Sequence, residues 1–245
     1  MVHQKIDFGI DLGTTNSAIA WMDNGEIKII KSNDGQMDTT PSVVHFNKAK
    51  TMFVGLKAFN QIDADAKKTL REFQSNGNSD GANTFFEFKR TMGTDKLYES
   101  SSAGRKFLSE ELSAEVLKKL KSYVLDEEIQ AVIITVPAKF RQNQLNATQQ
   151  ASELAGFTFC ELLQEPIAAS IAYGLEAQNI KGYWLVFDFG GGTFDAALMK
   201  VDDGIMKVVD TEGDNHLGGK NIDHAILDHL LIPAIGQNFE IGTLL

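Results

Sequence analysis

Hydrophobic positions along the chain fall into short continuous runs and stripes at helical spacing, and the two kinds alternate. Residues 131–136 form an unbroken, largely β-branched run that Pro137 ends, which is typical of a buried strand. The elements predicted here are a strand at 131–136, a helix at 141–155, a strand at 157–163 and a helix at 165–176. This alternation predicts an α/β fold.

Upstream, a helix is predicted to begin at Ser109, because two glutamates follow it and an apolar stripe comes next. The stripe consists of Leu112, Val116, Leu117 and Leu120. Two polar, glycine-containing stretches, 75–83 and 100–104, are predicted to be loops. The aromatic-rich stretch 85–93 is predicted to be a further helix.

The chain contains an internal repeat. Residues 11–22 align without a gap with residues 188–199, and the similarity continues through a hairpin turn, Asn24-Gly25 in one copy and Asp203-Gly204 in the other. Each copy predicts a strand, a tight turn, a strand, a hairpin and a third strand. Two homologous lobes are the natural interpretation.

The repeat also predicts the domain organisation. We expect a first lobe at residues 1–177, with a subdomain inserted at about 32–106 between its strands. Residues 178–245 are then the beginning of a second lobe, which we expect to be incomplete.

Composition restricts the class of protein further. The single cysteine, Cys160, cannot form an internal disulfide, and no secretory signal follows Met1, which predicts a cytoplasmic protein. No apolar run approaches the roughly 20 residues that cross a bilayer, so no membrane association is expected. The net charge of -10 argues against a nucleic-acid partner.

The turns of the repeat are candidate phosphate-binding sites. The P-loop pattern is missing, and the glycines at 190–192 lead into a hairpin rather than a helix, so the dinucleotide pattern also fails. Instead, each copy has a strand ending in aspartate and then a glycine- and threonine-rich turn, whose backbone N–H groups can form an anion-binding nest. Facing copies of this turn could hold the phosphates of one nucleotide from both sides.

Three charged side chains are candidates for chemistry. Asp11 and Asp188 occupy equivalent places in the two copies, and a pair of carboxylates suits Mg²⁺, although each aspartate could instead cap its own turn. The duplication favours the metal-binding role of the two aspartates over the capping role. Lys89 would project outward from the predicted helix at 85–93; taken alone, it and Arg90 are typical solvated charges.

At this point the motifs resemble one family, the seventy-kilodalton heat-shock chaperones of the DnaK type, within the actin and sugar-kinase superfamily. The motifs are residues 9–17 (GIDLGTTNS), 39–42 (TTPS), 134–138 (ITVPA), 164–175 (QEPIAASIAYGL), 187–195 (FDFGGGTFD) and 213–219 (GDNHLGG). They occur in the family's order over nearly the whole chain. The resemblance implies the N-terminal part of a nucleotide-binding domain with actin-like, ribonuclease H-like lobes, the second of them truncated.

The resemblance also implies roles for single residues. Catalysis would involve Asp11, Lys89, Glu165, Asp188 and Thr193. The nucleotide would be bound by Gly13, Thr14, Thr15, Asn16, Lys89, Gly190, Gly191, Gly192, Thr193, Gly218 and Gly219. Mg²⁺ would be held, largely through water, by Asp11, Asp188 and Glu165, and a monovalent ion such as K⁺ would lie near Asp195.

As a family member, the protein is expected to bind ATP and ADP and to hydrolyse ATP in support of protein folding. A J-domain cochaperone and a nucleotide-exchange factor are the expected partners, and unfolded clients would bind through a C-terminal domain beyond these residues. Because the second lobe is expected to be incomplete, weak nucleotide affinity and self-association are also expected.

Some positions depart from the family pattern. Asp38, Lys139 and Leu145 stand where the family usually has arginine, tyrosine and arginine, which suggests a divergent bacterial-type paralogue with an altered relay between domains. Two other functions in the superfamily remain alternatives: a phosphotransferase such as a sugar or acetate kinase, and an actin-like filament protein.

Overall fold

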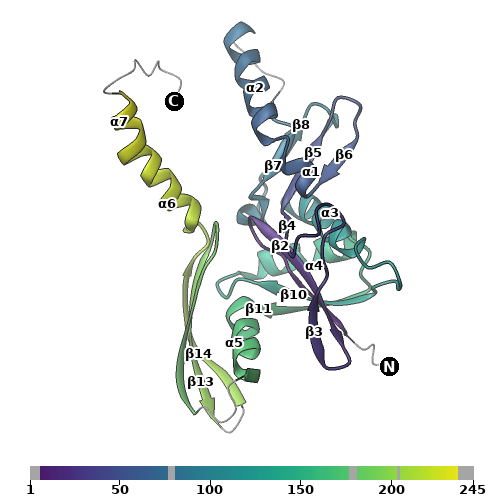
Figure 1. The fold of residues 1–245 in the computed structure, drawn as a ribbon, viewed down its shortest axis with the longest axis vertical. Helices are drawn as coiled ribbons and strands as arrows, with labels where there is room; N and C mark the ends of the chain where they lie inside the picture. Colours follow the sequence, from purple (N-terminus) through teal and green to yellow (C-terminus); the bar gives the residue numbers. More distant parts are fainter. Residues whose placement is uncertain (1–5, 77–80, 177–180, 203–204, 237–245) are drawn as a thin grey trace.

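The computed structural model describes residues 6–76, 81–176, 181–202 and 205–236, and it is a mixed α/β structure (Figure 1). Its larger sheet has six strands in the order β11-β10-β1-β2-β3, with β4 paired to β2. The strands are β1 (Phe8–Asp11), β2 (Asn16–Asp23), β3 (Glu26–Ile29), β4 (Thr40–Pro41), β10 (Ala131–Val136) and β11 (Phe159–Gln164). The parallel strands β1, β10 and β11 lie side by side, and β2 and β3 continue the sheet as antiparallel strands.

The predicted helices pack against this sheet. Helix α4 (Gln142–Leu154) connects β10 to β11, and α3 (Ser109–Lys121) packs beside α4. The four residues of the apolar stripe on α3 are at most 1% exposed and belong to one core with strands β1 and β10. The helix predicted to begin at Ser109, the strand predicted at 131–136 and the helix predicted at 141–155 are therefore confirmed, to within a residue or two at their ends.

The region between β4 and α3 forms smaller sheets. Its elements are β5 (Val43–Phe46), β6 (Met52–Val54), α1 (Leu56–Phe59), α2 (Ile62–Asn76), β7 (Thr84–Phe86), a 3-10 turn (Phe88–Thr91), β8 (Tyr98–Ser100) and β9 (Arg105–Phe107). The loop predicted at 100–104 is confirmed one residue later, as the turn at 101–104 that joins β8 to β9. The loop predicted at 75–83 is partly wrong, because α2 extends through Asn76; residues 77–80 lie outside the described residues.

The helix predicted at 85–93 is also wrong. Its first residues form β7, where Phe85 pairs with Val44 of β5 and its ring packs among those of Phe46, Tyr98 and Phe107. Aromatic residues suit such a pleated surface, and this cross-strand packing overrides the helical pattern. Glu87 then adopts a left-handed conformation, with φ 57°, which separates the strand from the 3-10 turn that carries Lys89.

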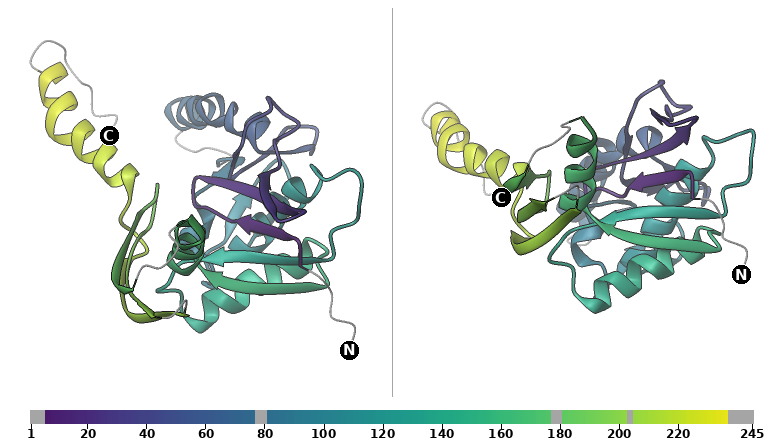
Figure 2. Two further views of the ribbon diagram at one scale, coloured as in Figure 1. Left: turned by 60° about the horizontal axis from the view of Figure 1, so that its bottom comes forward. Right: turned by 90° about the horizontal axis from the view of Figure 1, so that it is seen from below.

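The second copy of the repeat forms a separate three-stranded sheet. It consists of β12 (Gly182–Phe189), β13 (Phe194–Asp202) and β14 (Ile205–Asp214), paired antiparallel in chain order. Helix α5 (Glu165–Glu176) packs between this sheet and the larger one (Figure 2). The predicted strand, turn and hairpin pattern is thus present in both copies. In the first, Asn24 and Gly25 both have positive φ, as a two-residue hairpin of type I′ requires; the Asp203-Gly204 turn lies outside the described residues.

A helical rod follows the second sheet. It consists of α6 (Gly219–Ile226), a π-helical turn (Leu227–Leu231) and α7 (Ile232–Gly236), and Figure 1 shows it projecting from one end of the sheet. His224 and His229, which lie on this rod, are exposed, and the described residues contain no group of three or more His, Cys, Asp or Glu side chains placed to hold a metal ion. No described helix is both long and apolar enough to cross a membrane.

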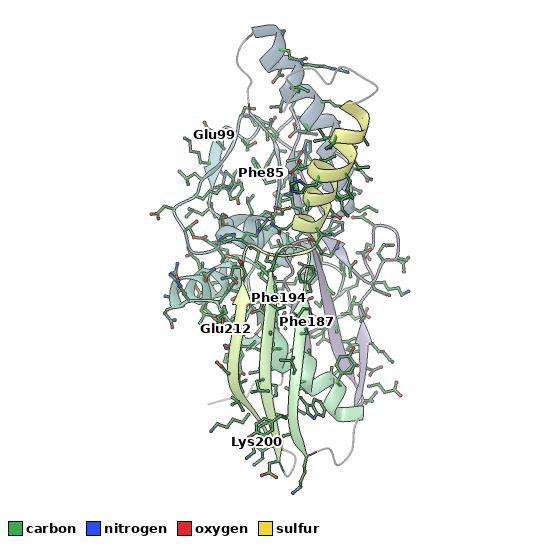
Figure 3. All side chains as sticks on the ribbon, turned by 90° about the vertical axis from the view of Figure 1, so that its left-hand side faces the viewer. Phe85, Glu99, Phe187, Phe194, Lys200 and Glu212 are labelled. Carbon is green, nitrogen blue, oxygen red and sulfur yellow. The ribbon has the colours of Figure 1, made fainter. Side chains whose placement is uncertain are left out.

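Strand β12 exposes a row of large apolar side chains. Tyr183, Leu185 and Phe187 are 65–70% exposed, and Phe187 lies close to Phe194 of the neighbouring strand, with ring centroids 4.8 Å apart (Figure 3). β12 is also an edge strand, so both its apolar face and its free edge can pair with another molecule.

We therefore expect the 245-residue chain to self-associate in a concentration-dependent way. Leu185→Lys should shift it toward monomer in sedimentation velocity, because the charge interrupts the apolar row. Leu125→Lys is the matched control, since Leu125 is 81% exposed and lies outside this sheet. Wild-type protein that stays monomeric at all concentrations would contradict the prediction.

Candidate functional site

The turns of the two repeats meet at one cavity of about 530 Å³. The cavity is lined by Asp11, Gly13, Thr14, Thr15, Asn16, Lys89, Thr135, Glu165, Ala168, Ala169, Ala172, Asp188, Gly190, Gly191 and Thr193. Asp11, the last residue of β1, and Asp188, the last but one of β12, are present with residues of both turns, as are Lys89 from the 3-10 turn and Glu165 from the start of α5. The structure thus brings together most of the residues that the sequence analysis singled out, from segments far apart in the chain.

The first turn is held in place by serine side chains behind it. The Gly13 amide donates to Ser17 Oγ at 3.1 Å, and Ser42 Oγ donates to the Gly13 carbonyl at 2.8 Å. The Ser42 amide donates to the Thr15 carbonyl, also at 2.8 Å. A methyl group on Gly13 would overlap the Asn16 carbonyl, so this turn accepts only glycine there without moving. The turn is therefore rigidly shaped before any ligand arrives.

The second turn is supported from outside by the segment that begins α6. The amides of Gly219 and Lys220 donate to the carbonyls of Gly190 and Gly191, at 2.9 and 3.1 Å. A side chain at Gly218 would lie 2.5 Å from the Gly192 nitrogen, so the close approach of the two segments depends on glycine. Gly218 and Gly219 do not line the cavity, and their contacts are to the turn itself.

The two turns also contact each other. A methyl group on Gly191 would overlap the Thr15 hydroxyl, and one on Gly192 would lie 2.8 Å from Thr14 Cγ2. The glycines of the second repeat therefore allow the threonine side chains of the first repeat to come close. The two turns are therefore in direct contact at the cavity.

Three carboxylates face the cavity. Burial raises the pKa of Asp188 above its ordinary value, and the negative charge of Asp11 raises it further. Burial also raises the pKa of Glu165, against the opposing effect of Lys89. Carboxylates held close enough to disfavour each other's ionised form are a typical environment for a cation.

Lys89 is buried, and this differs from the expected outward-facing cation. It is 4% exposed, and its Nζ donates to Glu165 Oε1 at 2.7 Å. The neighbouring Phe88 and Met92 are at most 2% exposed and anchor the 3-10 turn in the core. The interpretation of Lys89 as an ordinary solvated charge is therefore wrong. Arg90, beside it, is half-buried.

Thr14 and the carboxylates provide a test of whether a phosphate and a metal fit. Thr14 Oγ1 is buried without a hydrogen-bond partner in the described part of the chain, although Thr14 lines the cavity. A buried hydroxyl without a partner costs about 1–3 kcal/mol, which a ligand oxygen can recover. Together with the glycine turns and the three carboxylates, this donor set fits an anion accompanied by a divalent cation.

Asp195 lies outside the cavity lining. It is 1% exposed, and its Oδ1 accepts a hydrogen bond from the Ala138 amide at 3.1 Å, which links β13 to the segment after β10. Burial raises its pKa. Its observed contact thus joins the second repeat to the segment after β10, and the suggested monovalent-ion site stays a prediction.

Further links between distant segments lie outside the cavity lining and were not predicted from the sequence. Glu87 forms ion pairs with Lys220 at 2.6 Å and with Arg90 at 3.3 Å, and Arg90 also donates to the His216 carbonyl at 2.6 Å. Lys139, one of the departures from the family pattern, pairs with Glu212 of β14 at 3.1 Å. Ion pairs near the surface are individually weak, so each of these links adds little to the stability of the contact between the segments.

The raised pKa of Asp188 predicts a gain in stability when its charge is removed. A carboxyl whose pKa is raised on folding stabilises the folded state below its ordinary value of 3.8, and this contribution is lost as pH rises through the folded-state pKa. Asp188→Asn should therefore raise the free energy of unfolding at neutral pH, by up to about 1 kcal/mol because solvent screens the half-buried group.

The gain should shrink as pH falls toward 4, and urea unfolding in EDTA at two pH values measures it. Asp210→Asn, an exposed position on the same sheet, is the control. A variant that is less stable than wild type at neutral pH would contradict the interpretation of the carboxylate cluster as strained.

Comparison with known proteins identifies a family. Residues 7–239 match the family model described as HSP70, Hsp70 protein. The chain is 39% identical over 226 residues to the chaperone protein DnaK of Thermosipho melanesiensis and, equally, to that of Thermosipho africanus, covering 91% of this chain and 35% of each relative. It is also 39% identical over 241 residues to the chloroplastic heat shock 70 kDa protein 7 of Arabidopsis thaliana, covering 94% of this chain and 33% of that protein.

The chain spans about a third of the length of these curated relatives. The matched region corresponds to the N-terminal part of the nucleotide-binding domain, which is where the motifs, the two repeats and the shared cavity lie. The chain belongs to the HSP70 family.

Proposed function

We propose that this chain supplies the phosphate- and metal-binding part of the ATPase site of a DnaK-type chaperone that assists protein folding. One observation carries the proposal: the aspartate-and-turn segments of both repeats line a single cavity with Lys89 and Glu165. An arrangement of this kind can hold a phosphate chain from both sides.

Each group has a role that follows from its position. The turn at residues 13–16 and the turn at 190–193 bind phosphate oxygens through backbone amides and the hydroxyls of Thr14, Thr15 and Thr193. Asp11 and Asp188 hold Mg²⁺, mostly through water, as this ion prefers. When bound, the metal offsets negative charge on the phosphates.

Lys89 and Glu165 act together on the attacking water. Glu165 accepts from Lys89 at 2.7 Å, which fixes both side chains at the cavity wall. Glu165 then orients a water molecule by accepting its hydrogen bond, and the Lys89 ammonium offsets charge on the terminal phosphate. Phosphoryl transfer is accelerated mainly by such positioning and electrostatic stabilisation, so no covalent intermediate is needed.

The described lining contains no aromatic or large apolar side chain that could stack on a base. Recognition by residues 1–245 is therefore directed at the triphosphate and its metal, with ATP and GTP bound about equally and weakly. In this proposal, the whole protein selects the base, binds unfolded clients, and works with a J-domain cochaperone and a nucleotide-exchange factor. We also propose a first lobe at residues 1–177, with an insert at about 32–106, and a second lobe that begins at residue 178. A K⁺ ion near Asp195 and a cytoplasmic location are further parts of the proposal.

Phosphate release from saturating MgATP, without an added acceptor, tests the proposal. The wild-type chain should release phosphate slowly, and Lys89→Ala should abolish it. Asp188→Asn should also abolish it while remaining at least as stable as wild type, so that loss of activity is not loss of fold. Release that requires a sugar or acetate would indicate a phosphotransferase, and ATP-dependent sedimentation would indicate a filament protein. No release from a chain that binds MgATP would also contradict the proposal.

A further inference from the structure

Thr135 lies at the cavity but has no place in the roles proposed above. Its Oγ1 donates a hydrogen bond to Asp11 Oδ1 at 2.8 Å, and Thr135 lines the same cavity as Asp11. We propose that Thr135 is a positioning residue that orients the Asp11 carboxylate toward the bound metal. This inference rests on the proposed function and deepens it.

The strand register explains why the two side chains meet. β1 and β10 are parallel neighbours, with Ile10 opposite Ile134, so Asp11 and Thr135 form the next pair and point to the same face of the sheet. On β10, Val132, Ile134 and Val136 are at most 1% exposed and point toward the opposite, helix-covered face. Thr135 therefore faces the cavity rather than the core.

Packing does not require a hydroxyl at this position. Thr135 is half-buried beside the apolar wall formed by Ile133 on the same face, where valine would fit the same space and suit a strand equally well. What valine lacks is the donor. The hydroxyl is thus the one feature of Thr135 that its hydrogen bond to Asp11 requires.

A hydrogen bond from a neutral hydroxyl to a carboxylate fixes the rotation of the carboxylate. With Oδ1 held by Thr135, the carboxylate plane is set before the metal arrives, and less orientational freedom is lost on binding. Residues that hold metal-binding groups in this way typically contribute about 10- to 100-fold to metal affinity. Because Asp11 and Asp188 would hold the metal mostly through water, the lower end of that range is expected.

The test is the Mg²⁺ dependence of nucleotide binding, measured with a fluorescent ATP analogue by anisotropy. Thr135→Val should raise the Mg²⁺ concentration for half-maximal binding about tenfold. It should leave the melting temperature and the residual binding in EDTA unchanged. Thr135→Ser keeps the donor and should restore the wild-type midpoint. Thr158→Val, at a threonine whose hydroxyl donates to the Gln130 carbonyl, is a control outside the cavity.

Each possible result supports or overturns the proposed role of Thr135. An unchanged midpoint in Thr135→Val would overturn the inference, and so would a Thr135→Ser variant that behaves like Thr135→Val, since the effect would then come from packing. If the wild-type chain bound the nucleotide equally well with and without Mg²⁺, the proposed metal-binding role of Asp11 would be wrong. The role of Thr135, which depends on it, would then be wrong as well. A Mg²⁺-dependent wild type with an unaffected Thr135→Val would overturn the inference alone.

Discussion

Replacing Lys89 with methionine is expected to destabilise the protein by about 3–5 kcal/mol at neutral pH, the usual cost of removing one partner of a buried ion pair. Lys89 is 4% exposed and the Glu165 side chain 13% exposed, so the remaining carboxylate would stay buried without its counter-charge. Burial and two nearby aspartates already raise the pKa of Glu165. The loss should therefore become smaller in acid, where Glu165 takes up a proton.

A double-mutant cycle with Glu165→Gln separates this effect from lost packing. The double variant Lys89→Met/Glu165→Gln should be more stable than Lys89→Met, because no unpaired charge remains in the site. The exposed pair Lys118 and Glu115, 2.8 Å apart, is the control and should couple by less than about 1 kcal/mol. Additive losses for Lys89 and Glu165 in urea unfolding would show that the two charges do not depend on each other.

Gly191→Ala is expected to weaken nucleotide binding at least tenfold, or about 1.4 kcal/mol. The added methyl would overlap the Thr15 hydroxyl, and the Thr15 Cβ would lie only 3.2 Å from it, so the two phosphate-binding turns must separate. Calorimetric titration with MgADP measures the effect. Since the methyl points at Thr15 of the first repeat, the ion pair of Lys89 and Glu165 should be unaffected.

Gly9→Ala is the matched control for this substitution. A methyl group at Gly9 would meet no atom within 4 Å, although Gly9 lies on β1, which leads into the first turn. It should bind nucleotide as wild type does. Equal affinities for Gly191→Ala and wild type would mean that the close contact between the turns is unimportant for the ligand.

The repeat was readable from the sequence because both copies keep the same short-range signals. Aspartate at a strand end, a glycine-rich turn and an Asn-Gly or Asp-Gly hairpin are local features, and each predicts its own strand pair. The burial of the α3 stripe was readable for the same reason, since helical spacing alone determines which side chains share a face.

The position of Lys89 could not be read from the sequence. It depends on β7 pairing with a strand about 40 residues earlier, on the left-handed Glu87, and on Glu165, which lies 76 positions further along. Thr135 was missed because a threonine in a β-branched run looks like any strand residue. Only the register of β1 and β10 shows that its hydroxyl lies beside Asp11. A motif match could indicate Gly218 and Gly219, but not that they support the second turn from outside.

Calorimetric titration of the wild-type chain and of Asp11→Asn/Asp188→Asn with ATP, in Mg²⁺ and in EDTA, tests whether the cavity binds a nucleotide together with a metal ion. We expect one site per chain, affinity in the micromolar to millimolar range, a marked loss of affinity in EDTA, and little difference between ATP, GTP and tripolyphosphate. The double variant should show no Mg²⁺-dependent binding. Wild-type affinity in that variant, or no binding by the wild-type chain at millimolar MgATP, would contradict the assignment of the cavity.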